Sequence, residues 1–383
     1  MKRFIALLIA ILVLFLVGCS KTEQPKESEP EKETTTEYVP TPEEVQIAKM
    51  SLEEKVAQLF FIMPEALDPT LPEDTKVTAI TDTMKNTYKE YPAGGIILFA
   101  KNIENPEQLT KLTSDIHALN ELTPLIGVDE EGGSIARVAK NPNFNVTKFS
   151  SMLATKDADE AYNIGKTIGT YLNQYGFDVD FAPVADVNTN PSNPVIGKRA
   201  FSANPENAAK MVAGAIKGFH DANIMTSIKH FPGHGDTQTD THKGYAETQK
   251  TWEEIKSCEM IPFIKGIDAG TDMVMVAHIA APKVTGDGTP ATLSYTLITE
   301  KLRGELNYQG VVITDGMNMG AIAQQYDAAD AAVKAIEAGV DIILLPENYI
   351  EAYNGVLTAV QNGTITEERI DESVMRILHL KLN

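Results

Sequence analysis

The sequence predicts a single (β/α)8 barrel of the TIM type, preceded by a signal peptide and a flexible tether. Two observations favour this fold. Eight short apolar runs alternate with amphipathic stretches from about residue 47 to the C-terminus, as in chains that build parallel sheets. Polar residues also follow five of these runs at the same end, which is where barrel enzymes assemble their sites. An open, doubly wound sheet is the alternative architecture.

The apolar runs have the length of strands buried on both faces. We expect strands over residues 58–62, 95–99, 125–128, 179–182, 225–229, 273–277, 310–314 and 341–345. Helical periodicity separates them, for example over 106–119, 205–219, 252–269 and 328–338. Two of these helices open with Asn-Pro-Glu, at Asn105 and Asn204, where Asn can cap the helix and Pro suits its first turn.

Candidate functional residues stand at the carboxyl ends of five predicted strands. They are Asp129, Glu130 and Glu131 after the third strand, Asp186 after the fourth, Lys229 and His230 closing the fifth, His278 after the sixth and Asp315 after the seventh. Because the carboxyl ends of barrel strands open onto one face, these side chains are expected to share one site.

The segment after the fifth strand carries the strongest chemical signal. Residues 229–242 hold three of the seven histidines, a lysine and two aspartates, and their Pro and Gly residues exclude a continuous helix. Within it, Asp240 and His242 form an Asp-x-His pair, in which the carboxylate can orient the imidazole as a general acid/base. A zinc site is the alternative. It would use His230, His234, Asp236, Asp240 and His242, although their spacing fits no zinc motif.

Asp315 follows the apolar strand 310–314 and precedes Gly316, which leaves room for a ligand. A carboxylate at a barrel mouth can act as a nucleophile or stabilise a developing cation. Its structural alternatives are a helix N-cap or an ion-pair partner for Lys229. Asp129, Arg137, Lys198 and Arg199 supply further charged donors and acceptors, so the site suits a polar, uncharged or weakly acidic small ligand.

The N-terminus predicts export. Lys2 and Arg3 precede an apolar run over 4–17 and then Gly18-Cys19, which resembles a lipoprotein signal. We therefore expect a signal peptide over 1–19, lipidation of Cys19, a flexible tether over 20–46 and the barrel over 47–383, held outside the cytoplasm on the membrane. A membrane-spanning anchor is the alternative, although the run is shorter than the roughly 20 residues that a span needs.

Composition excludes other classes of partner. The net charge of −20 argues against nucleic acid, which proteins bind by neutralising phosphates with Lys and Arg. The two cysteines are Cys19 and Cys258, so lipidation of the first leaves no internal disulfide. Cys258 lies in a helical pattern and is expected to pack in the core. The chain is expected to be a monomer without a cofactor or metal.

Several of these motifs together resemble the bacterial β-N-acetylglucosaminidases of glycoside hydrolase family 3. Residues 229–235 (KHFPGHG) with Asp240-Thr241-His242 are similar to that family's long acid/base element, with Thr241 in place of the usual Ser. Residues 313–319 (ITDGMNM) are similar to its nucleophile segment, and residues 128–133, 275–278 and 290–294 to three further elements. The resemblance spans about residues 50–380.

The resemblance implies a retaining, two-step cleavage of terminal β-linked N-acetylglucosamine. Asp315 would be the nucleophile, and His242, oriented by Asp240, the acid/base. The expected substrate-binding residues are Asp129, Arg137, Arg199, Lys229, His230, His278 and Met317. Ser134 departs from the family pattern, which often has Arg there.

Three other functions remain open at this stage. A β-glucosidase of the same family is one alternative, which the Asp240–His242 pair disfavours. A phosphorylase of the same family is another, and a histidine in the acid/base role leaves it open, because it repels incoming phosphate less than a carboxylate would. A sugar-binding lipoprotein is the alternative from another class, and it would need neither a nucleophile nor an acid. The natural substrate is expected to be a cell-wall fragment or a chitin-derived oligosaccharide.

Overall fold

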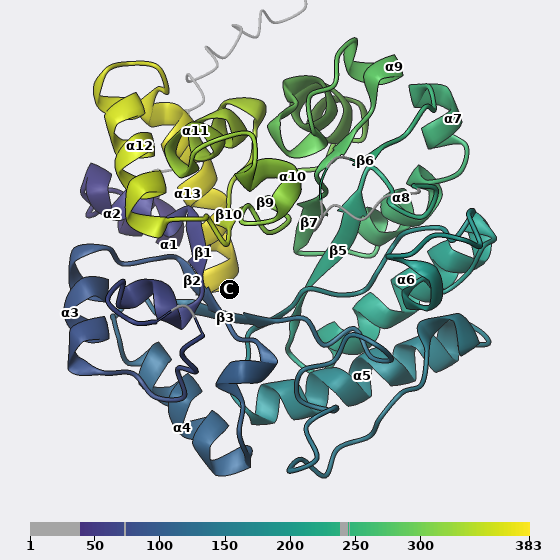
Figure 1. Cartoon of the computed structure of the whole chain (residues 1–383), viewed down its shortest axis with the longest axis horizontal. Helices are drawn as coiled ribbons and strands as arrows, with labels where there is room; N and C mark the ends of the chain where they lie inside the picture. Colours follow the sequence, from purple (N-terminus) through teal and green to yellow (C-terminus); the bar gives the residue numbers. More distant parts are fainter. Residues whose placement is uncertain (1–38, 73, 238–243, 245) are drawn as a thin grey trace, which may run out of the picture. The chain divides into compact units, whose positions relative to one another are not determined.

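The computed structural model describes residues 39–72, 74–237, 244 and 246–383, and the folded unit extends from Thr41 to Asn383. Its centre is a parallel sheet of eight strands, surrounded by helices (Figure 1). In sheet order the strands are β10 (Ile343–Leu344), β1 (Phe60–Ile62), β2 (Gly95–Ile97), β3 (Leu125–Val128), β4 (Val179–Asp180), β5 (Met225–Phe231), β7 (Met273–Val276) and β9 (Val311–Thr314).

A parallel bridge between Ile313 and Ile342 connects β9 to the start of β10 and closes the sheet into a barrel. The predicted (β/α)8 fold is therefore confirmed, and the open sheet is excluded. Each predicted strand region coincides with or overlaps one of the eight barrel strands, and β5 extends two residues beyond its predicted end. The first is shorter than expected because Gln58 ends helix α2 (Leu52–Gln58), which Ser51 and Glu54 begin with a reciprocal cap. A small second sheet pairs β6 (Ala246–Glu247) with β8 (Ile279–Ala280).

The outer layer of the barrel is helical. Its longer helices are α3 (Asp82–Glu90), α4 (Pro106–His117), α5 (Ala158–Gln174), α6 (Pro205–His220), α8 (Met260–Asp268), η6 (Thr296–Glu305), α11 (Ala328–Ala338), α12 (Tyr349–Gln361) and α13 (Glu367–Leu382). Asn105 and Asn204 cap α4 and α6 as expected. Among the described residues, no helix is long and apolar enough to span a bilayer.

The prediction of one helix over 252–269 is wrong. The segment forms α7 (Trp252–Lys256) and α8 (Met260–Asp268), separated by a turn. Pro262 has no N–H to donate to the carbonyl of Cys258, so an uninterrupted helix would lose a hydrogen bond at this point.

The folded unit also begins earlier than residue 47. Helix α1 (Pro42–Ile47) occupies residues that we assigned to the tether, and Thr41 and Glu44 cap it reciprocally. Glu43 accepts hydrogen bonds from His379 and Asn383 at the end of α13, which ties α1 to the barrel. Cys19 and the rest of residues 1–38 lie outside the described residues.

Apolar side chains fill the barrel below the site. The rings of Phe61 and Phe181 meet edge to face inside it, with centroids 6.1 Å apart. A Cβ at Gly95 would lie 2.2 Å from the Phe61 ring, and one at Gly127 would lie 2.7 Å from the Phe181 ring. Because side chains alternate along a strand, the next inward positions after Phe61, Gly95 and Gly127 are Met63, Ile97 and Asp129. These three residues line the cavity that lies above the rings of Phe61 and Phe181.

Three aspartates brace the opposite end of the barrel. Asp178, Asp272 and Asp341 each precede a strand and accept the backbone N–H of Ile126, Thr226 and Val312, respectively, on the neighbouring strand. Each also pairs with a basic side chain from the surrounding helices, namely His117, His220 and Arg303. This repeated contact holds the strand pairs in register away from the site.

Candidate active site

A cavity of about 540 Å³ opens at the carboxyl ends of the strands, which is within the usual size range of a small-molecule site. Its polar wall includes three carboxylates, from Asp129, Glu131 and Asp315, and four cations, from Lys101, Arg137, Arg199 and Lys229. The remaining wall is largely apolar, with Met63, Ile97, Phe99, Ile135, Val195, Met275, Met319, Leu344 and Leu345. His230 and His234 also face the cavity.

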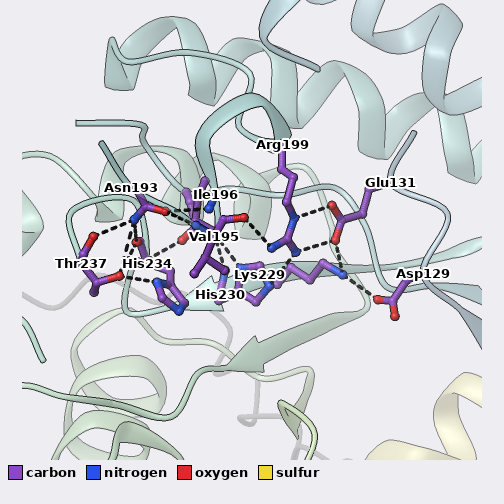
Figure 2. Close-up of polar contacts among 11 residues, drawn as sticks. Asp129, Glu131, Asn193, Val195, Ile196, Arg199, Lys229, His230, His234 and Thr237 are labelled. Carbon is purple, nitrogen blue, oxygen red and sulfur yellow. Dashed lines mark hydrogen bonds and ion pairs between the residues drawn. The ribbon is translucent and has the colours of Figure 1, made fainter. Parts of the chain in front are cut away.

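Lys229 is the centre of the polar wall. It is 2 % exposed, and its Nζ lies 2.7 Å from Asp129 Oδ1 and 2.7 Å from Glu131 Oε1. Burial by itself would lower the pKa of Lys229, but the two carboxylates outweigh it and raise the pKa. The lysine is therefore a fixed ammonium ion that connects the third and fifth strands (Figure 2).

Arg199 extends this network to the loop after β4. Its Nε and Nη2 donate to the two oxygens of Glu131, at 2.8 and 2.7 Å, in a bidentate pair. Its Nη1 donates to the backbone oxygen of Val195. Glu131 is thus held by two cations, which lower the pKa of its carboxyl although burial opposes them.

Arg137 comes from the loop after β3. Its Nη2 donates to Asp129 Oδ2 at 3.3 Å, and its guanidinium lies over the ring of Phe99, 5.5 Å from the centroid. Glu130 holds this loop in place, because its carboxylate accepts the backbone N–H groups of Arg137, Val138 and Ala139. Tyr171 on α5 donates a fourth bond to the same carboxylate.

His230 has its tautomer set by Asp186. Its Nδ1 lies 2.7 Å from Asp186 Oδ2, and its Nε2 lies 3.2 Å from Nη2 of Arg199. A guanidinium can only donate, so Nε2 must accept and the proton must be on Nδ1. Burial and the charge of Arg199 hold the pKa of His230 well below its usual value, so the ring is neutral. Burial raises the pKa of Asp186 to about 6.

Asp315 differs from the other carboxylates of the cavity. Among the described residues, its side chain accepts one hydrogen bond, from the N–H of Gly316 at 2.8 Å, and forms no ion pair. Burial would raise its pKa, but His230, His278, the Gly316 N–H and Lys229 outweigh burial and lower it. Helix α10 (Gly320–Ala323) begins five residues later with Met319 as its N-cap, so Asp315 is not a helix cap. Asp315 is an ionised carboxylate exposed to the cavity.

The structure brings together Asp129, Arg137, Arg199, Lys229, His230 and Asp315 on the cavity wall. It does not place His278 and Met317 there, so their direct contact with a ligand stays a prediction. Met317 packs beside Ile322 and Tyr326 in the core, because the chain turns at Met317 and Asn318 after β9. Asn318 and Met319 line the wall instead.

His278 lies behind Asp315. Its Nε2 donates to the backbone oxygen of Gly316 at 2.8 Å, and its Nδ1 lies 2.7 Å from Thr292 Oγ1. These contacts fix the backbone that carries the carboxylate, so His278 helps to position Asp315.

Two predicted residues, Asp240 and His242, lie outside the described residues. The chain that leads to them is well held. Asp186 Oδ1 accepts the backbone N–H of His234 at 2.6 Å, and Asn193 donates to the carbonyl oxygens of His234 and Thr237. Gly235 packs directly on the loop after β4, since a Cβ there would lie 1.8 Å from the Val187 oxygen.

The described residues give no support to the zinc alternative. They contain no group of three or more His, Cys, Asp or Glu side chains that could hold a metal. Of the five candidate ligands, His230 has a carboxylate at Nδ1 and the Arg199 guanidinium at Nε2. A metal ion bound at Nε2 would be repelled by the charge of Arg199.

Cys258 is partly buried, and burial raises the pKa of its thiol, so it is not a reactive thiolate.

Sequence reasoning missed the parts played by Glu130, Glu131, Asp186 and Asn193. Glu131 is among the candidates after the third strand, and its sharing of a partner with Asp129 could have been inferred, because it stands two residues later and alternate residues of an extended chain share a side. Asp186 was noted only for its place after a strand. No local signal marks the contact that Asn193 makes with the loop after β5, since the two carbonyls that its Nδ2 binds lie more than 40 residues away in the sequence.

The family model of the glycosyl hydrolase family 3 N-terminal domain matches residues 51–380. The chain is 35 % identical over 333 residues to beta-hexosaminidase A of Pseudoalteromonas piscicida, covering 80 % of this chain and 56 % of the relative. It thus spans little more than half of that protein. It is 34 % identical over 293 residues to a beta-hexosaminidase of Pseudomonas aeruginosa, covering 76 % of this chain and 85 % of the relative.

The chain is also similar to solved structures of enzymes described in the same terms. A glycoside hydrolase family 3 beta-N-acetylglucosaminidase from Paenibacillus sp. str. FPU-7 aligns with a TM-score of 0.80 and 38 % identity, covering 87 % of this chain and 62 % of that one. A beta-N-acetylhexosaminidase from Beutenbergia cavernae aligns with a TM-score of 0.77 and 25 % identity, covering 87 % of this chain and 98 % of that one.

Proposed function

The chain belongs to glycoside hydrolase family 3, and we propose that it is a retaining hydrolase that removes terminal β-linked N-acetylglucosamine from oligosaccharides. Two relatives described as beta-hexosaminidases and a neighbour described as a beta-N-acetylglucosaminidase support this substrate class. Cell-wall fragments and chitin-derived oligosaccharides carry such a terminal sugar, and we propose them as the natural substrates.

The observation that carries the proposal is the state of Asp315. Asp129 and Glu131 are neutralised by Lys229, Arg137 and Arg199, whereas Asp315 is ionised and forms no ion pair among the described residues. A carboxylate in this state can attack an anomeric carbon and then serve as the leaving group when water arrives.

The charged network beside Asp315 is suited to holding the sugar. Asp129 can accept bonds from sugar hydroxyls, whereas Lys229, Arg137 and Arg199 can donate to hydroxyl and acetamide oxygens. Since ion pairs already fix these groups, they need not reorganise when the substrate binds.

The acid/base is assigned to His242, oriented by Asp240. In the first step His242 would donate a proton to the departing glycosidic oxygen, and in the second it would take a proton from the attacking water. The sequence pattern and the anchored segment before it support this assignment.

The location is also a proposal. The basic head, apolar run and Gly18-Cys19 junction support an extracytoplasmic lipoprotein anchored to the membrane through Cys19. Incorporation of labelled palmitate in wild type but not in Cys19→Ser would support it. Equal labelling of both would contradict it.

The substrate is tested by comparing p-nitrophenyl N-acetyl-β-glucosaminide with the corresponding β-glucoside, with and without added phosphate. We expect higher kcat/KM for the N-acetylglucosaminide and release of β-configured N-acetylglucosamine, as retention requires. Better turnover of the glucoside would make it a β-glucosidase. A sugar phosphate product that depends on phosphate would make it a phosphorylase, and binding without turnover would favour a sugar-binding lipoprotein.

A further inference from the structure

The buried side chain of Asn193 connects two loops of the active site. Asn193 is 7 % exposed and lies in the loop between β4 and α6. Its Nδ2 donates across to the loop after β5, to His234 O at 2.8 Å and Thr237 O at 2.9 Å. Its Oδ1 accepts from its own loop, from Val195 N at 2.8 Å and Ile196 N at 2.7 Å (Figure 2). The amide therefore uses both donors and both acceptor positions.

Each end of this bridge leads to a functional group. On one side, Val195 lines the cavity and its carbonyl accepts a bond from Arg199, which the bidentate pair with Glu131 holds in the polar wall. On the other side, Thr237 lies three residues before Asp240 and five before His242. The bond to Thr237 O therefore fixes the point from which the acid/base segment starts.

We propose that Asn193 is a positioning residue for acid/base catalysis. Its side chain bonds Thr237 to the loop that carries Arg199. It thereby fixes the start of the segment that carries the acid/base, relative to the residues that would bind the sugar. This inference rests on the proposed function, because it takes His242 as the proton donor. Asn193 itself need not touch the substrate, since it does not line the cavity.

The loops have other contacts, so the role of Asn193 can be separated from folding. Asn190 also bonds to this segment, through its N–H to Gly235 O at 3.2 Å and its Nδ2 to Thr237 O at 3.3 Å. Asp186 holds His234 N. We therefore expect Asn193 variants to fold and to keep Arg199 and Asp315 in place, with the entry point of the acid/base less well fixed.

The test compares the effect of Asn193→Asp on two substrates that differ in their need for an acid. A dinitrophenyl N-acetyl-β-glucosaminide has a leaving group that departs without a proton, whereas the phenyl glycoside needs one. Asp retains an acceptor for Val195 N and Ile196 N but removes the donor to His234 and Thr237. We expect kcat/KM to fall about tenfold more for the phenyl glycoside than for the dinitrophenyl glycoside. This is less than the whole rate enhancement of about 10²–10⁴-fold that general acid catalysis supplies, because His242 itself is still present. Asn193→Ala should show the same selectivity.

Gln108→Glu is the matched control. Gln108 also accepts a backbone N–H, from Glu104 at 2.8 Å, and donates to two carbonyls, of Thr78 at 2.8 Å and Asn102 at 3.1 Å, but it belongs to α4 and does not line the cavity. We expect this variant to affect both substrates equally. Equal losses for both substrates in Asn193→Asp would overturn the proposal, as would the same selectivity in Gln108→Glu.

His242→Ala separates this inference from the proposed function. It should lose activity selectively on the phenyl glycoside, to a greater degree than Asn193→Asp. If His242→Ala is not selective, the acid/base assignment itself is wrong. If His242→Ala is selective and Asn193→Asp is not, the assignment stands and the positioning role of Asn193 is wrong.

Discussion

The ammonium of Lys229 lies 2.7 Å from the carboxylate of Asp129, although 100 residues separate them in the sequence. Lys229 lies near the end of β5 and Asp129 directly follows β3, so the contact spans the intervening strand β4. Glu131 pairs with the same ammonium and also with the guanidinium of Arg199. The positive and negative groups of the sugar-binding wall are therefore fixed before a ligand arrives, while Asp315 is left without an ion pair among the described residues. This contrast leads to four predictions.

Asp315→Asn should abolish turnover with little effect on folding. The amide has the same shape but cannot form the glycosyl ester, so kcat should fall by about a thousandfold or more. Thermal unfolding should show a midpoint close to that of wild type, because Asp315 takes part in no ion pair with the residues that the structure describes. Residual activity above a tenth of wild type would remove Asp315 from the nucleophile's role.

Arg199→Met should reduce both stability and substrate affinity. The substitution leaves Glu131, whose side chain is 1 % exposed, with Lys229 as its remaining cation. Breaking a buried ion pair costs about 3 kcal/mol, which urea denaturation would detect. Arg199→Lys should recover only part of the loss, because lysine cannot donate two parallel bonds to one carboxylate. An unchanged urea midpoint in Arg199→Met would show that the pair does not contribute to stability.

Glu130→Gln should raise KM through Arg137. The carboxylate accepts three backbone N–H groups from residues 137–139, and an amide offers one oxygen for them. We expect a loss of about 2 kcal/mol in the free energy of unfolding and a several-fold increase in KM with a smaller change in kcat. Tyr171→Phe is the control, because it removes the side-chain bond and leaves the backbone bonds. A larger rise in KM in the control would contradict this account of Glu130.

Asp186 should make the stability of the protein depend on pH. Burial raises the pKa of its carboxyl from 3.8 to about 6 in the folded state, so the folded protein binds a proton that the unfolded chain has released. The stabilisation is complete below about pH 4 and is lost as the pH rises through 6, a change of about 3 kcal/mol. The free energy of unfolding of wild type minus that of Asp186→Asn should therefore fall between pH 4 and 7. A constant difference over this range would mean that the pKa is not raised.

The sequence predicted the barrel because each strand is an apolar run between amphipathic segments. This pattern is visible within a few consecutive residues, since it reflects which residues of each segment are buried. It failed at Trp252–Ala269, where apolar periodicity continues across a turn, and at the N-terminal boundary, where α1 is too short to show a period. The family resemblance implies that Met317 binds substrate, but the chain turns after β9 and this side chain packs in the core.

By itself, the sequence determined which strands form and which polar residues stand at their carboxyl ends, because the alternation of apolar and polar residues is a local property of the chain. It therefore brought Asp129, Lys229, His230 and Asp315 to one face. Only the tertiary structure decided which of these charges are neutralised. Lys229 pairs with Asp129 and Glu131, Asp186 sets the proton of His230, and Asn193 joins two loops. Such pairings depend on distances between segments that are far apart in the sequence, and those distances exist only once the barrel has closed.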